Sequence, residues 1–150
     1  EIRRLQQVLA MAKERASSLG IGYADFRFVP EEQPVCPQDP RDSMFVRTDG
    51  AVSPCINLAY GGESSFLGAP SFQSFVHFGH LPADDLQDVW EGGTCAGYRK
   101  LFQDRSLAYA KEMAKSLSLG DSEMDARLNA RSVMDKAAKG CRVCHYLYGM

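Results

Sequence analysis

No apolar run in this 150-residue sequence approaches the ~20 residues that a membrane-spanning helix needs. A basic excess is also lacking, since 17 Lys and Arg stand against 19 Asp and Glu, and the formal net charge is −2. Proteins that bind nucleic-acid backbones normally carry a clear positive charge. The charged amino end has no apolar core after it and is not a signal peptide. We therefore expect a protein that binds neither a membrane nor nucleic acid.

The number of cysteines is odd, with five residues at positions 36, 55, 95, 141 and 144. Without a secretory signal, the chain is expected in a reducing compartment, where thiols usually serve metal or redox chemistry rather than disulfides. The odd count also leaves one cysteine over from any complete pairing. We expect a cytoplasmic protein whose cysteines act as thiolate ligands. The composition, 45% hydrophobic and 24% charged, fits one soluble domain with a modest core.

The amino-terminal segment has the pattern of a helix followed by a strand. Residues 2–19 carry apolar side chains at helical spacing, and Gly20 follows where a left-handed helix cap is expected. Residues 23–29 alternate in the manner of a strand. The first residues already belong to the helical pattern and include no initiating methionine, so we expect the natural protein to continue upstream.

A β-hairpin is the strongest local signal. Residues 44–47 and 51–53 are predicted as its strands, with Asp49-Gly50 as a two-residue turn. The hairpin folds the chain back on itself between two cysteines that are distant in sequence. We therefore expect Cys36 and Cys55 to approach one metal centre.

The remaining segments are predicted to be loops and helices. Residues 30–42 form a proline-rich extended linker, and residues 59–74, rich in Gly and Ser, form a loop. The mixed charges of residues 99–115 and 121–139 are typical of solvated helix faces. The expected fold class is α+β, in which a small β-hairpin or antiparallel sheet carries a four-cysteine metal site and packs with several helices. Helices are predicted over residues 84–90, 97–118 and 121–138, the last capped by Asp121 and ended by Gly140.

The pair Cys141-Arg142-Val143-Cys144 places two sulfurs within reach of one metal, because the short loop between them turns back. Gly140 is expected to give the backbone the freedom for this turn. Such a pair is shared by zinc sites, iron–sulfur sites and redox dithiols. Two single cysteines together with a pair suit a cubane cluster, which takes one cysteine for each iron. A structural zinc site, a redox dithiol and inert buried cysteines stay open as alternatives.

Two residues near these motifs receive no ligand role. Cys95 has no neighbouring partner cysteine and is predicted to be a simple thiol, buried or exposed. His145 follows Cys144 directly and is predicted either to hydrogen-bond near the metal or to lie on the surface.

Several motifs follow one another in a distinctive order. Cys36 is followed by a strand, then by Thr48-Asp49-Gly50-Ala51-Val52, and then by Pro54-Cys55. The set spans residues 33–147 and resembles the SPASM and twitch auxiliary-cluster domains of radical S-adenosylmethionine enzymes, although His80 stands where that family commonly has Asn. The later motifs of the set are Phe78-Gly79-His80-Leu81, Leu86-Gln87-Asp88-Val89-Trp90, Tyr98-Arg99-Lys100-Leu101 and Cys141-Arg142-Val143-Cys144.

The resemblance implies that Cys36, Cys55, Cys141 and Cys144 bind one [4Fe-4S] cluster, which serves electron transfer or substrate positioning. Full SPASM domains have more cysteines and two clusters, so the single-cluster twitch form fits better. The alternative from another class is a structural zinc module that mediates protein contacts. Zinc is also a possible substitute at the same thiolates.

The resemblance also implies a domain plan and a set of partners. Residues 1–29 resemble the last helix and strand of an upstream barrel, and residues 30–150 resemble the auxiliary domain, with a helical insertion near residues 105–139. The radical-generating Cys-x-x-x-Cys-x-x-Cys motif is absent from this sequence. S-adenosylmethionine is therefore expected only in the upstream barrel of the same polypeptide, and this segment is not catalytic alone. The other implied partners are an electron-donor protein and an unidentified substrate, for which a peptide is one candidate.

Overall fold

Residues 2–23 and 29–150 are described by the computed structural model of the chain. Contacts divide the chain into two units, Glu1–Pro30 with Met150, and Glu31–Gly149. The strand predicted over residues 23–29 falls mainly on residues outside the described ranges. Within those ranges, no helix is long and apolar enough to cross a bilayer.

Helix α1 (Ile2–Ser18) belongs to the first unit and confirms the helix predicted there. Its end is closed by Gly20, whose φ of 67° lies in the left-handed region. The amide of Ile21 donates to the carbonyl of Ala16 at 2.9 Å, and that of Gly20 donates to Ser17 at 3.1 Å. This bonding pattern satisfies the last helical carbonyls, so the predicted glycine cap is also confirmed.

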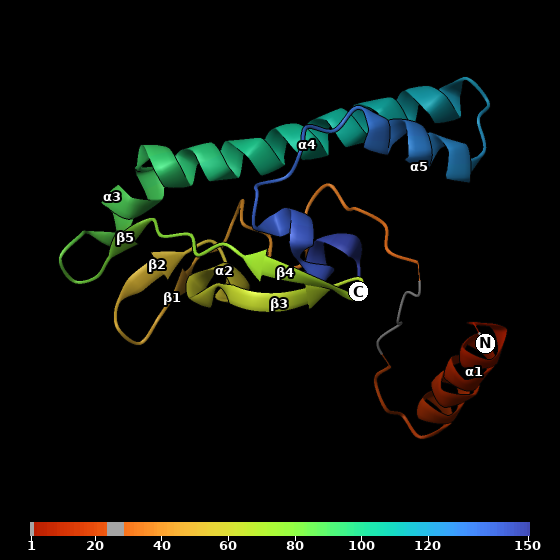
Figure 1. Ribbon diagram of the computed structural model, residues 1–150. Coiled ribbons are helices and arrows are strands. Elements are labelled where there is room, and N and C mark those ends of the chain that lie inside the picture. Colours follow the sequence, from red (N-terminus) through yellow and green to blue (C-terminus); the bar gives the residue numbers. More distant parts are fainter. Residues whose placement is uncertain (1, 24–28) are drawn as a thin grey trace. The chain divides into compact units, whose positions relative to one another are not determined.

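The second unit contains a three-stranded antiparallel sheet in the order β1-β2-β5 (Figure 1). Its strands are β1 (Phe45–Val46), β2 (Ala51–Ser53) and β5 (Gly79–His80). The central strand β2 is buried along its whole length. After β2 the chain passes through Pro54 to Cys55. A cysteine thus lies just beyond the most buried strand of the sheet.

The β1–β2 connection is a three-residue loop, so the predicted two-residue turn is wrong in length. The amide of Arg47 donates to Ala51 at 2.9 Å, which leaves Thr48, Asp49 and Gly50 as the loop. The Gly50 amide donates back to Arg47 at 3.0 Å, and its φ is 93°. This is the three-residue hairpin geometry in which a tight turn is followed by one left-handed residue.

A second hairpin replaces the loop predicted over residues 59–74, which is a correction. After helix α2 (Ile56–Tyr60), strand β3 (Gly62–Phe66) pairs antiparallel with strand β4 (Ala69–Gln73). Leu67 and Gly68 both have positive φ, at 52° and 79°. Two such residues make the turn whose twist matches that of the flanking strands.

Three helices follow the sheets. Helix α3 (Leu86–Glu91) starts at Asp85, whose carboxylate accepts from the amide of Gln87 at 2.8 Å. Helix α4 (Gly93–Ser118) begins earlier than predicted. Helix α5 (Glu123–Ser132) is capped by Ser122 rather than Asp121, and it ends well before residue 138. With two small sheets and several helices, the predicted α+β class is confirmed.

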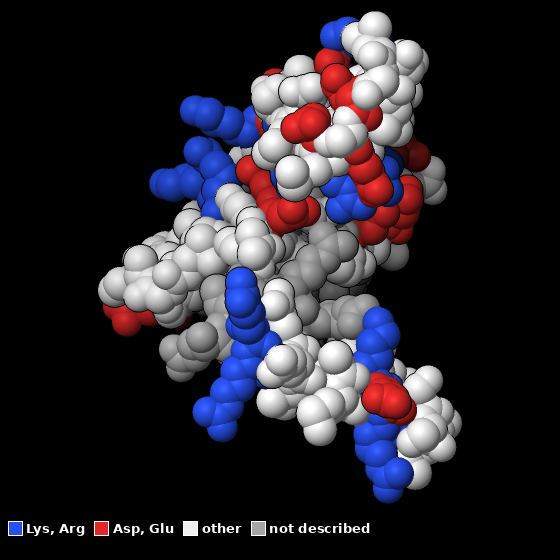
Figure 2. Space-filling model, turned by 90° about the vertical axis from the view of Figure 1, so that its right-hand side faces the viewer, with Lys and Arg blue, Asp and Glu red and all other residues white. Residues whose placement is uncertain are grey.

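Helices α4 and α5 form a hairpin whose end carries acidic and basic side chains in a mixed pattern, as the upper part of Figure 2 shows. Ion pairs there include Lys115 with Glu112 at 2.9 Å and Arg127 with Glu123 at 2.5 Å. The prediction of solvated charged faces therefore holds for this end of the hairpin.

The chain after α5 returns to the body of the unit without regular structure until two short 3-10 helices, η1 (Cys141–Val143) and η2 (His145–Tyr148). These turns lie between α4 and the β3–β4 hairpin (Figure 1). The core forms where they meet α2 and α4, from Leu58, Phe102, Ala137, Cys141 and Leu147. One cysteine is thus part of the core itself.

Candidate metal centre

Four cysteines come together from three separate segments. Cys36 lies in the proline-rich segment, and Cys55 lies between β2 and α2. Cys141 is the first residue of η1, and Cys144 directly follows η1. Burial is the main cause that raises the pKa of Cys36, Cys55 and Cys141, and negative charge on neighbouring thiols of this group adds to each rise. Coulomb effects weaken with distance. Their mutual influence therefore indicates that the four cysteines are neighbours.

The loop after Cys36 is held in shape by an ion pair. The guanidinium of Arg41 donates to both carboxylate oxygens of Asp39, at 2.8 and 2.6 Å, and these bonds lower the pKa of Asp39. The amide of Asp39 donates to the carbonyl of Cys36 at 3.0 Å. Burial raises the pKa of Cys36, and the backbone of Gln38 and Asp39 acts in the opposite direction. The turn thus keeps backbone donors near this cysteine.

Cys55 lies at the start of α2, and its side chain makes no capping hydrogen bond there. Burial raises its pKa, and the nearby backbone of Asn57 and Leu58 acts in the opposite direction. Cys55 itself is extended, with φ −164° and ψ 168°, and the helix begins at the next residue. The change from strand to helix at this cysteine places its side chain beside the first turn of α2.

The turn before Cys141 depends on close packing at Gly140 rather than on backbone freedom. Gly140 has φ −68° and ψ −29°, which any residue can adopt, so the expected role is wrong. A Cβ on this residue would instead lie 2.6 Å from Cδ2 of Leu58. The absence of a side chain lets the cysteine turn press against α2. The amide of Cys144 then donates to Cys141 at 3.1 Å and closes the turn.

Two side chains contact the sulfurs of this pair. The hydroxyl of Tyr98, on α4, lies 3.1 Å from Sγ of Cys141, and Nδ2 of Asn57 donates to Sγ of Cys144 at 3.5 Å. Burial raises the pKa of Cys141 to about 12 and holds that of the Tyr98 hydroxyl well above its usual range. A cationic group would favour the thiolate form of such buried cysteines, because thiolate ligands bind metals with release of their protons. The donors and the burial therefore fit an inorganic cationic group.

Arg105 ties two of the cysteine-bearing segments to α4, and sequence patterning missed it. Its side chain is 1% exposed, although it was expected on a solvated face. It donates to the carbonyls of Gln33 and Pro34 at 3.0 and 3.1 Å, just before Cys36. It also donates to the carbonyl of Asp135, on the segment that leads to Cys141. One buried guanidinium thus fixes both approaches to the cysteine group.

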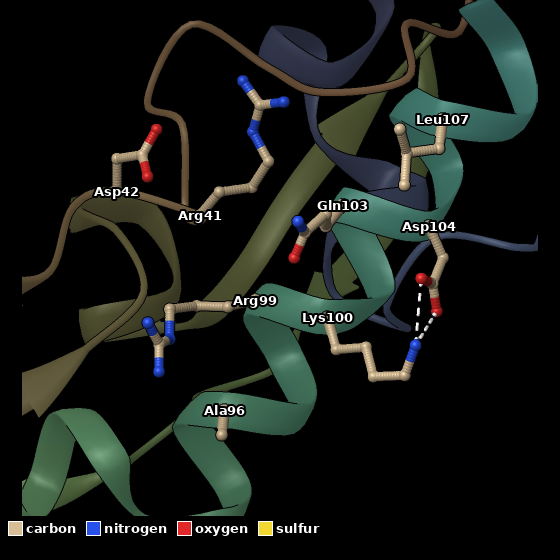
Figure 3. Close-up of a pocket in the computed structure, with 8 residues that line it drawn as sticks. All are labelled: Arg41, Asp42, Ala96, Arg99, Lys100, Gln103, Asp104 and Leu107. Atoms are coloured by element: carbon tan, nitrogen blue, oxygen red, sulfur yellow. Dashed lines mark hydrogen bonds and ion pairs between the residues drawn. The ribbon is translucent and has the colours of Figure 1, made fainter.

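A polar cleft of about 650 Å³ lies between the loop after Cys36 and α4 (Figure 3). Its cations have partners: Arg41 pairs with Asp39, and Lys100 pairs with Asp104 at 2.7 Å. Arg99 lies over the Trp90 ring, 4.0 Å from its centroid. The cleft thus has charges of both signs, and its cations already have partners. It is lined by Arg41, Asp42, Ala96, Arg99, Lys100, Gln103, Asp104 and Leu107.

The remaining candidates lie apart from the four sulfurs. Cys95 is buried in the first turn of α4, and the nearby charge acting on it is that of Arg99. His145 is exposed, with its ring 5.4 Å from that of Phe66, so it occupies the predicted surface position. In the described part of the chain, no set of three or more His, Cys, Asp or Glu is arranged to hold a single metal ion. The four thiols are neighbours, but they are not arranged as the ligands of a single metal ion.

A family model described as SPASM, an iron–sulfur cluster-binding domain, matches residues 36–115. The matched residues include Cys36 and Cys55, whereas Cys141 and Cys144 lie beyond them. No curated protein and no solved structure matches the chain. The match covers more than half of the sequence and confirms the resemblance seen in its motifs. The chain belongs to the SPASM family of iron–sulfur cluster-binding domains.

Proposed function

We propose that the unit Glu31–Gly149 is the auxiliary-cluster domain of a radical S-adenosylmethionine enzyme and holds one [4Fe-4S] cluster. The proposed ligands are Cys36, Cys55, Cys141 and Cys144. The observation that carries the proposal is the gathering of these four free thiols, from three segments, in a chain of an iron–sulfur family. A cubane takes one cysteine for each iron, which is the number available.

The chemistry that such a cluster supplies when bound is one-electron transfer. The residues of this chain would hold it and control its surroundings. Burial and the nearby backbone set the pKa of Cys36 and Cys55, and Tyr98 and Asn57 contact the sulfurs of Cys141 and Cys144. The apolar side chains of Leu58, Phe102 and Leu147 exclude water on the core side. Hydrogen bonds and solvent exposure of this kind set cluster potentials.

The single-cluster, twitch-like form is supported by the position of the fifth cysteine. Cys95 is buried in α4 away from the others, so the chain offers four grouped thiols and no second set among the residues described. We assign S-adenosylmethionine to an upstream barrel of the same polypeptide, with residues 1–29 as its last helix and strand. An electron-donor protein in the cytoplasm and a substrate of unassigned class, a peptide being one candidate, complete the proposal.

A structural zinc module is the second candidate, because four cysteine thiolates are also a common zinc set. Metal and sulfide analysis of anaerobically prepared protein separates the two. The proposal expects about four iron and about four sulfide per chain, with a brown colour that dithionite bleaches. One zinc per chain without sulfide, in anaerobic protein reconstituted with both metals, would establish the zinc module instead.

A further inference from the structure

Tyr98 and Asn57 are the two side chains of the described residues that hydrogen-bond to sulfurs of the cysteine group. They stand on different elements, α4 and α2, and they reach the two members of the terminal pair. Among the described residues, no side chain hydrogen-bonds to the sulfur of Cys36 or Cys55. The side-chain hydrogen bonds to sulfur at this site therefore lie at the terminal pair.

Binding of iron fixes the direction of the Tyr98 bond. In the free thiol, either the hydroxyl or the Cys141 sulfur can be the donor across their 3.1 Å separation. A thiolate bound to iron has no proton, so only the phenol can then donate. The Nδ2 group of the Asn57 side chain can only donate, and it lies at the longer distance of 3.5 Å from Sγ of Cys144. Both side chains would then place positive hydrogen on sulfur.

Such donors favour the reduced cluster. Reduction adds one electron to the cluster, supplied in solution by dithionite, and raises the negative charge that the sulfurs share. A hydrogen bond to a more negative acceptor is stronger. The Tyr98 bond is the shorter of the two, and its partner Cys141 is the more enclosed cysteine at 8% exposure. Low local polarity strengthens the bond further.

On the basis of the proposed cluster, we propose that Tyr98, with a smaller contribution from Asn57, is a positioning residue that raises the cluster's reduction potential through its hydrogen bond to Cys141. The effect acts through the ligand sulfur, so Tyr98 is not a ligand itself. Removal of the hydroxyl would leave the ring in place against Phe78 and Phe102, with centroids 5.6 and 5.5 Å away. Tyr98→Phe is therefore a conservative test.

The experiment is a redox titration of anaerobically reconstituted protein, followed by the electron paramagnetic resonance signal of the reduced cluster. We expect Tyr98→Phe to lower the reduced-to-oxidised ratio at a fixed potential about tenfold, which is about 59 mV for one electron. Asn57→Leu is expected to shift the midpoint in the same direction by less. Tyr148→Phe is the matched control, since Tyr148 packs on the same core without a bond to sulfur.

Equal midpoints for Tyr98→Phe and Tyr148→Phe would overturn the inference while leaving the cluster proposal intact. A wild-type protein that binds no iron and sulfide would instead overturn the proposed function, and the inference with it. If Tyr98→Phe loses its cluster, resonance Raman spectra of the wild-type protein in H₂O and D₂O decide. A deuterium shift of the iron–thiolate bands that persists in Asn57→Leu supports the Tyr98 bond, and bands insensitive to deuterium overturn it.

Discussion

Arg105 donates from Nη2 to a carboxylate oxygen of Glu32 at 2.8 Å, with the arginine buried and the glutamate about one-third exposed. The same guanidinium holds the carbonyls that precede Cys36 and the carbonyl of Asp135. Replacing it would leave these acceptors without their donor inside the protein. We expect Arg105→Met to lower the free energy of unfolding by about 3 kcal/mol. Denaturant unfolding of anaerobically reconstituted protein measures this.

Arg105→Lys is the matched comparison for that prediction. Lysine keeps the charge and can reach some of the acceptors, but it lacks the planar fork that serves four of them. We expect Arg105→Lys to lose less stability than Arg105→Met and to keep part of the iron that the wild type binds. A stability for Arg105→Met within about 0.5 kcal/mol of wild type would show that the tether is dispensable.

The cysteines provide a second test, one thiol at a time. We expect alanine at Cys36, Cys55, Cys141 or Cys144 to remove most of the bound iron, because each sulfur would hold a different iron of the cubane. Cys95→Ala should keep the wild-type iron content and lower stability by about 1 kcal/mol through loss of a buried side chain. Iron and sulfide analysis of all five variants is the measurement. Loss of iron from Cys95→Ala comparable to the other four would contradict the assignment.

Alanine substitutions at two glycines are expected to change stability in opposite directions. Gly50 has φ 93°, and a Cβ there would collide with the carbonyl of Leu81. Gly50→Ala is expected to lower stability by about 2 kcal/mol. Gly97 lies inside helix α4 with nothing within 4 Å of a Cβ, so Gly97→Ala should raise stability by roughly 0.5–1 kcal/mol. Thermal unfolding of both variants tests this prediction. A change of stability in the same direction for both variants would refute it.

Removal of the cluster should loosen the segment after α5 first. That segment has no regular structure between Ser132 and Cys141, and Lys136 and Lys139 are exposed on it. Binding to the folded state alone stabilises that state, so chelation is expected to lower Tm on the order of 10 °C. Limited trypsin digestion should then cut at these lysines before Lys111 in helix α4. The same order and rate of cutting with and without the cluster would argue against the binding site.

Local signals explain what the sequence could predict. The β1–β2 hairpin follows from Asp49-Gly50, the α1 end follows from Gly20, and the grouping of four cysteines follows from a hairpin and a short terminal loop. Each of these depends on a few neighbouring residues. The ligand role of the four thiols remains a prediction, because the family match ends at residue 115, before the terminal pair.

Long-range contacts explain what the sequence could not predict. Arg105 lies among alternating charges, and its burial depends on partners up to 73 residues away in sequence. Tyr98 is 43 residues from Cys141, so no spacing rule connects them. The β3–β4 hairpin was missed because Gly and Ser resemble loop composition, although Ser64 and Ser71 bond across the strands at 2.7 Å. In each case a tertiary partner outweighs local propensity.

Helix α4 has 26 residues and is therefore about 39 Å long. Tyr98 and Arg105 lie in its first half, whereas Ser116 near its end bonds to Asn129 of α5 at 3.1 Å. At the tip that joins α4 to α5, Leu119 is 74% exposed and Gly120 has φ 91°. This tip belongs to neither the core nor the group of four cysteines. A change in the length of this arm by whole turns is therefore expected to leave the sulfurs undisturbed. A fluorophore or affinity tag inserted at the tip would likewise report on the loaded protein while leaving its chemistry untouched.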